Sequence, residues 1–307
     1  MKILLTGSNG MVGKNILEHA GAKAYQFLTP SHAELNLLDQ KEVEAYFKAQ
    51  KPQAVIHCAG LVGGIQANMR EPVRYLIENL EMGKNVLLSA RASGVTKLVN
   101  LSSSCIYHKN SDGFLKEEEI LTGPLEPTNE GYALAKITVM RLAQYMNKEF
   151  GKNHYKTIIP CNLYGRWDKF DEATSHMLPA VIRKIDKAVK GNESSVEIWG
   201  SGKARREFMY AADLADFIFF ALDNWDKVPE TLNVGLGNDH TIKEYYDVVA
   251  EVLGYTGDFH HDLSKPEGMR RKVVSVNKAN ALGWLASTSL REGIQATYKF
   301  YLEKGNV

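Results

Sequence analysis

The segment KILLTGSNGMVG, which spans residues 2–13, decides the fold of this chain. An apolar run from Ile3 to Leu5 leads into glycines at positions 7, 10 and 13, and residues with helical spacing follow. Glycine allows a tight turn and lets a pyrophosphate approach the backbone, while the free N–H groups at a helix N-terminus attract that anion. The place of the glycines between a strand and a helix predicts a dinucleotide site made of Gly7, Asn9, Gly10, Met11, Val12 and Gly13.

Short apolar runs alternate with helical patterns through the first half of the chain, which is typical of a parallel sheet covered on both faces. Strands are predicted at Lys2–Thr6, Ala24–Thr29, Ala54–His57, Lys97–Leu101 and Tyr155–Cys161. Helices are predicted at Met11–His19, Gln40–Ala49, Pro72–Ala92 and Tyr132–Glu149. The sequence therefore predicts the α/β class, with a Rossmann-type doubly wound parallel sheet.

After Asn162 the pattern loosens into a smaller mixed α/β region. Its predicted elements are helices at His176–Val189, Asp213–Leu222, Ile242–Leu253 and Leu290–Leu302 and a strand at Val196–Trp199. We expect residues 1–162, with returning segments near 207–240, to form the dinucleotide-binding domain and residues 163–307 to form mainly the substrate-binding region. No glycine- and serine-rich linker separates the two parts, so we expect a cleft between them.

The composition argues against several classes of partner. Lysine and arginine number 37 against 36 acidic residues, so the formal charge of +1 builds in no broad attraction to nucleic acid or to an anionic membrane. The three cysteines, Cys58, Cys105 and Cys161, lack the spacing of a zinc site, and an odd count argues against a disulfide framework. No apolar stretch approaches the roughly 18 residues of a spanning helix. We expect a cytoplasmic protein without bound metal.

The residues after the second predicted strand bear on the type of dinucleotide. A site specific for NAD places an acidic residue there to bind the ribose hydroxyls, but this chain reads Thr29-Pro30-Ser31-His32. Neutral or basic groups tolerate a 2′-phosphate, so the sequence favours NADP(H), with use of NAD(H) left open. Asp39 either accepts a hydrogen bond from the adenine amino group or caps the helix that starts near Gln40.

A catalytic group is predicted where the fourth strand ends. Tyr132 and Lys136 lie one turn apart on a helix, and Ser103 follows the strand Lys97–Leu101. Ligands of open α/β sheets bind outside the carboxyl ends of the strands, which brings the three residues together. Tyr132 can donate a proton to a carbonyl oxygen that accepts hydride, Lys136 can lower the phenol pKa and hold the nicotinamide ribose, and Ser103 can hydrogen-bond the oxygen.

These residues resemble the extended short-chain dehydrogenase/reductases, which combine such a glycine triplet with a serine, tyrosine and lysine set. Over nearly its whole length the chain is similar to the GDP-L-fucose synthase group, the GDP-4-keto-6-deoxymannose 3,5-epimerase/4-reductases, and to related GDP-4-keto-6-deoxyheptose reductases. The segments that carry this similarity are Val62–Ile65 with Ala67-Asn68, Ser103–Tyr107, Glu126–Tyr132, Asn162–Gly165, Ser175-His176, Trp199–Gly202, Arg206–Phe208 and Lys265–Gly268.

The resemblance implies NADP(H) as cofactor and a GDP-linked keto-sugar as substrate. It assigns further cofactor contacts to Cys58, Ala59, Gly60, Asn162, Leu163 and His176, beside Tyr132 and Lys136. It assigns substrate contacts to Met177, Lys184, Trp199, Arg206 and Lys265. It also makes Cys105 and His176 the base and acid of an epimerisation at C3 and C5, and it implies a homodimer that pairs through the helices Pro72–Ala92 and Tyr132–Glu149.

Other interpretations of these residues stay open at this stage. From the pattern alone, Cys105 is a buried thiol after a strand, His176 a residue of a helix N-terminus, Lys184 part of a solvated helix face and Trp199 a core aromatic. Lys265 with Arg270-Arg271-Lys272 forms either a closing loop or an exposed basic turn.

The chain departs from the synthase pattern in two places. The glycine loop and the Pro30–His32 segment lack the arginines that synthases can carry there, and His108, Arg166 and Trp167 differ near the expected sugar pocket. Two alternatives follow: a C4 reductase that acts on an already epimerised GDP-4-keto-6-deoxyheptose, and a non-catalytic dinucleotide sensor.

Overall fold

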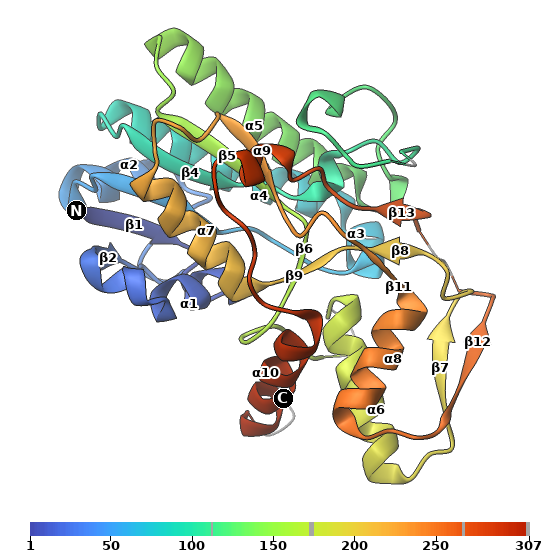
Figure 1. The fold of residues 1–307 in the computed structure, drawn as a ribbon. Helices are drawn as coiled ribbons and strands as arrows, with labels where there is room; N and C mark the ends of the chain where they lie inside the picture. The colour runs from blue at the N-terminus through green and yellow to red at the C-terminus, as the bar shows by residue number, and fades with distance from the viewer. Residues whose placement is uncertain (112, 172–174, 266–267, 305–307) are drawn as a thin grey trace.

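The central sheet is built from short runs of aliphatic residues that are buried on both faces. In this computed structural model, which describes residues 1–111, 113–171, 175–265 and 268–304, six strands run in the order β10–β5–β4–β3–β1–β2, and all neighbours are parallel. Figure 1 labels β1, β2, β4 and β5 of this sheet. The strands are β1 (Lys2–Thr6), β2 (Gln26–Leu28), β3 (Ala54–His57), β4 (Lys97–Leu101), β5 (Tyr155–Pro160) and β10 (Thr231–Val234). The predicted doubly wound parallel sheet is confirmed.

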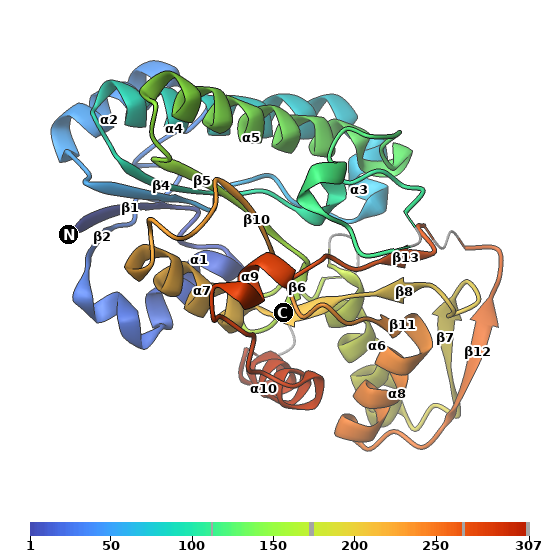
Figure 2. The ribbon, with the colours of Figure 1, turned by 45° about the horizontal axis from the view of Figure 1, so that its top comes forward.

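Helices cover both faces of the sheet, and the pleat of β1 decides which side chains each layer buries. Figure 2 shows α2 (Gln40–Gln50), α4 (Pro72–Ala92) and α5 (Glu130–Phe150) on one face and α1 (Met11–Glu18) and α7 (Ala211–Asp223) on the other. Ile3 and Leu5 belong to the core cluster that contains residues of α1 and α7 and part of α5, whereas Leu4 belongs to the cluster that contains residues of α2, α4 and another part of α5. This alternation is expected, because successive side chains of a β-strand point to opposite faces of the sheet.

A smaller mixed region lies beyond the carboxyl ends of the strands and has its own core cluster. Its helices are α6 (Met177–Gly191), α8 (Ile242–Leu253) and α10 (Leu290–Glu303). Its strands form the pairs β6 (Asn162–Tyr164) with β9 (Phe208–Tyr210) and β7 (Ser195–Trp199) with β12 (Asp258–Asp262), and the set β11 (His240–Thr241), β8 (Arg205–Arg206) and β13 (Arg271–Lys272). Short helices α3 (Ile65–Arg70) and α9 (Asn277–Ala281) complete the fold.

Two predicted elements are wrong in detail. The strand expected at Ala24–Thr29 covers only Gln26–Leu28, because Ala20–Ala24 forms a 3-10 helix whose start is capped by the His19 side chain. The Arg270–Lys272 segment is neither a closing loop nor an exposed turn, since Arg271 and Lys272 form β13 and pair with β8. The division into two domains stays a prediction. Within the described part of the chain, no helix combines the length and apolarity needed to cross a membrane.

Candidate active site

The turn between β1 and α1 is so tight that two of its positions require glycine. Gly7 has a φ of +71°, and a Cβ there would lie 2.6 Å from the backbone nitrogen of Ala59. A Cβ on Gly13 would lie 2.3 Å from the carbonyl oxygen of Gly7. Gly10 closes the turn by donating to the same carbonyl oxygen at 3.0 Å. The backbone of this turn is therefore bare, as a close approach by a pyrophosphate demands.

The start of α1 is open to an anion. Gly10 occupies the N-cap position and provides no capping side chain, and the first turn of the helix carries no acidic residue. The N–H groups of this turn and the positive end of the helix dipole are thus available to phosphate oxygens. Gly7, Asn9, Gly10, Met11, Val12 and Gly13 all lie on this turn or on the first turn of α1, so the residues fit the diphosphate of a dinucleotide.

The segment after β3 lies between the glycine turn and α5. The backbone nitrogen of Ala59 donates to Thr6 Oγ1 at 3.4 Å, and Thr6 Oγ1 lies 2.7 Å from His57 Nδ1. A Cβ on Gly60 would lie 3.4 Å from Lys136 Nζ. Cys58, Ala59 and Gly60 therefore lie between the glycine turn and Lys136 of α5, where the resemblance places cofactor contacts.

Asn79 on α4 fixes this segment from the other side. Its Oδ1 accepts from the backbone nitrogen of Leu61 at 3.0 Å, and its Nδ2 donates to the Leu61 carbonyl at 3.1 Å and to the Tyr75 carbonyl at 2.7 Å. Asn79 is buried, so these bonds replace contacts with water. Sequence reasoning missed this residue, because only the folded loop shows its backbone partner.

Lys136 is held at the carboxyl end of β4. Its Nζ donates to the carbonyl oxygen of Leu101 at 3.0 Å and lies 5.7 Å from the centre of the Tyr132 ring. The side chain is buried, and burial lowers its pKa, which the neighbouring thiols of Cys105 and Cys58 partly offset. The helical spacing of Tyr132 and Lys136 thus puts ammonium and phenol beside one strand end.

Ser103 reaches the same place from the loop after β4. It caps the short 3-10 helix Ser104–Ile106, and its Oγ accepts from the backbone nitrogen of Cys105 at 3.4 Å. It also hydrogen-bonds the Tyr132 side chain, which lowers the phenol pKa, although burial is the larger influence and leaves that pKa raised. The structure therefore brings together Ser103, Tyr132 and Lys136; their catalytic roles remain predictions.

Cys105 and His176 carry the groups expected for epimerisation. Cys105 is 7% exposed, and burial raises the pKa of its thiol despite the opposing charge of Lys272 and a hydrogen bond with Ser103. His176 occupies the N-cap position of α6, but its ring makes no capping hydrogen bond. Burial lowers the pKa of His176, and the charge of Lys272 lowers it further. The capping of α6 therefore does not explain why a histidine occupies position 176.

Lys272 is a site residue that the sequence analysis did not single out. It lies on β13 opposite Arg206 of β8, and its neighbours Arg271 and Arg205 form the adjacent pair of the register. Arg271 and Arg205 both bind Asp239, so alternation along the strands turns Lys272 and Arg206 to the other face. The thiol of Cys105 raises the pKa of Lys272, although burial is the larger influence and lowers it. The sequence does show a basic triplet, Arg270-Arg271-Lys272, whose side chains alternate in direction along a strand. Which of them faces the site depends on how β13 pairs with β8.

Glu207 fixes the strand that carries Lys272. Its Oε1 accepts from the backbone nitrogens of Leu236 and Gly237 at 2.6 and 2.8 Å, and its Oε2 accepts from that of Val274 at 2.8 Å. Its carbonyl oxygen accepts from Nδ2 of Asn162, one of the expected cofactor residues on β6, at 2.8 Å. One buried carboxylate therefore joins β8, the loop after β10 and the segment after β13 at the site.

Two of the predicted substrate residues lie beside an exposed indole. Trp199, at the end of β7, is 45% exposed, so its interpretation as a core aromatic is wrong. Lys184 Nζ and Lys265 Nζ lie 5.5 and 5.4 Å from its ring centre. Of the other two, Met177 begins α6, and Arg206 donates through Nη1 to the carbonyl oxygen of Arg205 at 2.8 Å. The indole between two lysines provides a stacking surface next to positive charge.

Other expected residues are placed more simply. Asp39 is the N-cap of α2, with Oδ1 accepting from Lys41 N at 2.8 Å, and its contact with adenine stays a prediction. Leu163 lies on β6, and Trp167 donates to Glu18 at the end of α1. Pro266 and Glu267 of the Lys265–Gly268 segment lie outside the described residues.

Comparison with known proteins agrees with this geometry. The model of the NAD dependent epimerase/dehydratase family matches residues 3–235. A GDP-L-colitose synthase of Yersinia pseudotuberculosis is 55% identical, over 100% of this chain and 99% of that protein. A GDP-L-fucose synthase of Azorhizobium caulinodans is 46% identical, over 100% and 98%. A solved GDP-mannoheptose C4 reductase from Campylobacter jejuni with NADP bound is 30% identical, with a TM-score of 0.89 and 98% of each chain covered.

Proposed function

We propose, from the premise that this chain belongs to the NAD dependent epimerase/dehydratase family, that it reduces the C4 keto group of a GDP-4-keto-6-deoxy sugar with NADP(H) and also epimerises the neighbouring carbons. The observation that carries the proposal is the convergence of Ser103, Tyr132 and Lys136 with the thiol of Cys105 at the carboxyl end of β4. The proposed reaction needs both the reducing group of Ser103, Tyr132 and Lys136 and the thiol of Cys105, because reduction and inversion act on adjacent carbons.

The cofactor would be held by the glycine turn, the start of α1 and the segment Cys58–Gly60. NADP(H) is favoured because the segment Thr29–His32, directly after β2, contains no acidic residue and because a relative of the same fold binds NADP. The bound nicotinamide supplies hydride to the carbonyl carbon. Use of NADH stays open, since the residues Thr29–His32 include no arginine to grip a 2′-phosphate.

In the reduction, the chain's own residues manage the oxygen and the proton. The Ser103 hydroxyl would donate to the C4 oxygen and hold it beside Tyr132. As hydride reaches C4, the C4 oxygen becomes an alkoxide, and Tyr132 donates the phenol proton to it. The buried ammonium of Lys136 stabilises the phenolate that remains until water returns the proton.

In the epimerisation, Cys105 and His176 work on opposite faces of the sugar ring. The C4 ketone acidifies the C–H bonds beside it, so Cys105 as thiolate can remove a proton, and His176 as imidazolium can return one from the other side. Burial disfavours the charged form of both residues. We infer that Lys272 influences the ionisation of both residues, because its ammonium favours the thiolate of Cys105 and disfavours the imidazolium of His176.

The relatives suggest two candidate sugars beside that of the fucose synthases. Colitose lacks the C3 hydroxyl of fucose, so C3 is not a stereocentre and only C5 needs inversion. The 55% identity to a GDP-L-colitose synthase favours a GDP-4-keto-3,6-dideoxy sugar as a second candidate. The similarity to a GDP-mannoheptose C4 reductase keeps a heptose reduced without epimerisation as the third, although Cys105 and His176 are both present.

A panel of GDP-4-keto sugars, tested with NADPH and NADH and followed by identification of the products by NMR, decides among these sugars. Incubation in heavy water without cofactor separates epimerase from simple reductase, since deuterium enters C5 only if a proton is removed there. Absence of hydride transfer to every member of the panel, despite cofactor binding, would identify a dinucleotide sensor instead.

We also propose a homodimer in the family manner. Four large apolar side chains are exposed along α4 and α5: Val73, Ile77, Leu134 and Tyr145, with exposed fractions of 73, 48, 40 and 61%. The two helices pack against each other, so a second copy would complete a four-helix arrangement and remove this apolar surface from water.

A further inference from the structure

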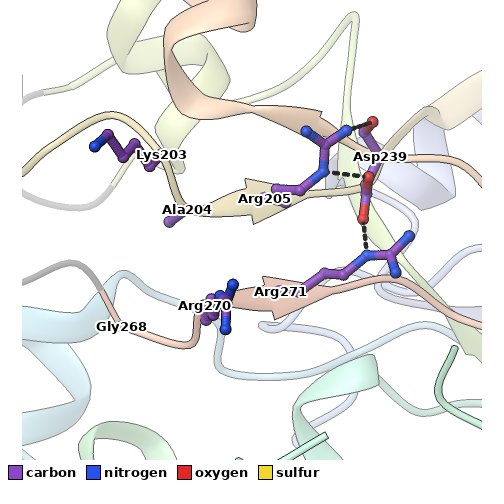
Figure 3. Close-up of a pocket in the computed structure, with 7 residues that line it drawn as sticks. All are labelled: Lys203, Ala204, Arg205, Asp239, Gly268, Arg270 and Arg271. Carbon is purple, nitrogen blue, oxygen red and sulfur yellow. Dashed lines mark hydrogen bonds and ion pairs between the residues drawn. The ribbon is translucent and has the colours of Figure 1, made fainter. Parts of the chain in front are cut away.

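The three-stranded sheet β11–β8–β13 has a second face that the proposed reaction does not use. Arg206 and Lys272 face the site, whereas Arg205 and Arg271, one position earlier in the same register, turn to the opposite side. A cavity of about 820 Å³ lies against that side. The residues that line it are Lys203, Ala204, Arg205, Asp239, Gly268, Arg270 and Arg271 (Figure 3).

Asp239 orders two of the cations. Its side chain is 3% exposed, and Oδ1 and Oδ2 accept from Nε of Arg205 and of Arg271, respectively, while its carbonyl oxygen accepts from Nη2 of Arg205. Figure 3 shows the two guanidinium groups reaching this carboxylate from neighbouring strands. Because Nε of both arginines is occupied, their orientation is fixed before any ligand arrives, and Arg271 keeps both terminal nitrogens for other acceptors.

The other two cations have no counter-charge. Among the described residues, neither the Lys203 nor the Arg270 side chain has a hydrogen bond or ion pair, and both are exposed. The lining holds four positive groups, Lys203, Arg205, Arg270 and Arg271, against the single negative charge of Asp239, which leaves three positive charges in excess. One further acid among the described residues, Glu244, places its Oε2 4.0 Å from Nη1 of Arg205 and offsets at most one of them.

We propose that this cavity is a second anion site, which binds the diphosphate or triphosphate group of a small molecule. Arginine forks match phosphate oxygens bidentately, and lysine adds a compact charge. The volume falls within the range of small-molecule sites, which argues for a compact ligand rather than for an extended acidic chain. The charged side chains of the cavity differ from Arg206 and Lys272, which turn to the other face of the sheet, although a Cβ on the lining residue Gly268 would lie 3.3 Å from Nη2 of Arg206. The cavity therefore adjoins the substrate site without sharing its cations, and this inference does not rest on the proposed reaction.

The shared chemistry, an oligophosphate, has two possible sources: a free phosphate compound or a second GDP-linked molecule. We test the site by calorimetric titration of inorganic pyrophosphate into the full chain mixed with one equivalent of GDP, which fills the tighter GDP site and leaves a second site free. The test variant is Lys203→Ser/Arg270→Ser, and the control is Lys48→Ser/Lys152→Ser, which removes two exposed charges elsewhere. All four side chains lie on the surface, so both variants should match the wild-type melting temperature.

With one equivalent of GDP present, we expect pyrophosphate to bind the wild type and the control equally, and to bind the test variant at least about tenfold more weakly, because two charge-assisted contacts are lost. A parallel titration with GDP distinguishes the sources: two GDP sites in the wild type and one in the test variant indicate a GDP-linked ligand, whereas a single GDP site in both indicates a free phosphate compound. Equal pyrophosphate affinity in the test variant and wild type would overturn the proposal. Failure of GDP to bind at all would count against the proposed substrate and leaves the pyrophosphate comparison readable.

Discussion

Lys136 Nζ donates a hydrogen bond to the carbonyl oxygen of Leu101, 3.0 Å away, at the last residue of β4. A charged donor on an α5 side chain is thereby tied to the end of the strand that leads into Ser103. The bond keeps the ammonium beside Tyr132 instead of letting a long flexible side chain sample solvent, and burial keeps the local dielectric low.

Replacement of Lys136 should therefore slow reduction strongly. Lys136→Met keeps the length of the stem but removes the charge that stabilises the Tyr132 phenolate, and we expect kcat to fall by about 100-fold or more. NADPH oxidation with the keto-sugar measures this. Lys148→Met, an exposed position on the same helix, is the control. Retention of more than a third of the rate in Lys136→Met would contradict the assigned role.

His57 should make the fold sensitive to acid. Burial, with a smaller contribution from the charge of Lys136, lowers its pKa from 6.5 to about 3. The unfolded chain therefore takes up a proton below pH 6.5 that the folded chain refuses until about pH 3, so stability is full above pH 6.5 and is lost as the pH falls. At pH 5 this one residue should cost about 2 kcal/mol of unfolding free energy relative to pH 7.5.

The measurement is urea unfolding of the wild type and of His57→Gln at both pH values. Gln can still bond with Thr6 but does not titrate, so the variant should lose about 2 kcal/mol less than the wild type between the two conditions. Because all other groups titrate alike in the two proteins, the difference isolates His57. An identical pH dependence in both proteins would exclude this account.

Local sequence patterns predicted the parts of the molecule that depend on neighbours in the chain. The β1–α1 turn was predictable because Gly13 lies against Gly7 and Ser8 within the turn itself, whereas the close approach of Gly7 to Ala59, in the segment after β3, is a distant contact that only the fold shows. The pairing of Tyr132 with Lys136 followed from helical spacing. For Asp39 the sequence left two roles, and local geometry makes it the N-cap of α2.

Residues whose surroundings come from distant segments could not be placed in this way. The direction of Lys272 depends on the register of β13 with β8, and the exposure of Trp199 depends on the packing of β7 against β12. The edge strand β10 was not predicted, although β3 is equally short, and β10 gains its place by pairing with β5. The direction of Lys272, the exposure of Trp199 and the position of β10 all depend on strand pairing between distant segments and not on local sequence preference.

The glycine turn yields a prediction with a built-in comparison. A methyl group at Gly13 would meet the Gly7 carbonyl oxygen at 2.3 Å, whereas at Gly10 the nearest atom would be 3.4 Å away. Gly13→Ala should therefore destabilise the fold by about 1–3 kcal/mol through overpacking, and Gly10→Ala should not. Thermal unfolding without cofactor measures both. Equal melting temperatures of the two variants would show that the turn yields more easily than its geometry suggests.

The apolar surface of α4 predicts the effect of charge on assembly. Val73→Glu/Ile77→Glu places two carboxylates in the proposed four-helix interface, so we expect the mass in sedimentation to fall from twice 34.3 kDa to 34.3 kDa. Leu285→Glu, at a side chain that is 68% exposed and lies outside both helices, should leave the dimer intact. A wild-type protein that sediments as a monomer would refute the interface.

Lys272 should control the pH dependence of epimerisation. Its ammonium lowers the pKa of the Cys105 thiol against the effect of burial, so removal of the charge should raise that pKa and move the onset of deuterium exchange at C5 to higher pH. At pH 7.5 we expect Lys272→Met to exchange at least about tenfold more slowly, in proportion to the lost thiolate, and to recover as the pH rises.

Lys272→Arg keeps the charge and should restore most of the rate, and Lys299→Met on the exposed side of α10 serves as the control. The rate of hydride transfer to an already epimerised sugar should change far less, because Tyr132 and Lys136 are untouched. An exchange profile in Lys272→Met that keeps the wild-type midpoint would mean that Lys272 binds substrate without setting the state of Cys105.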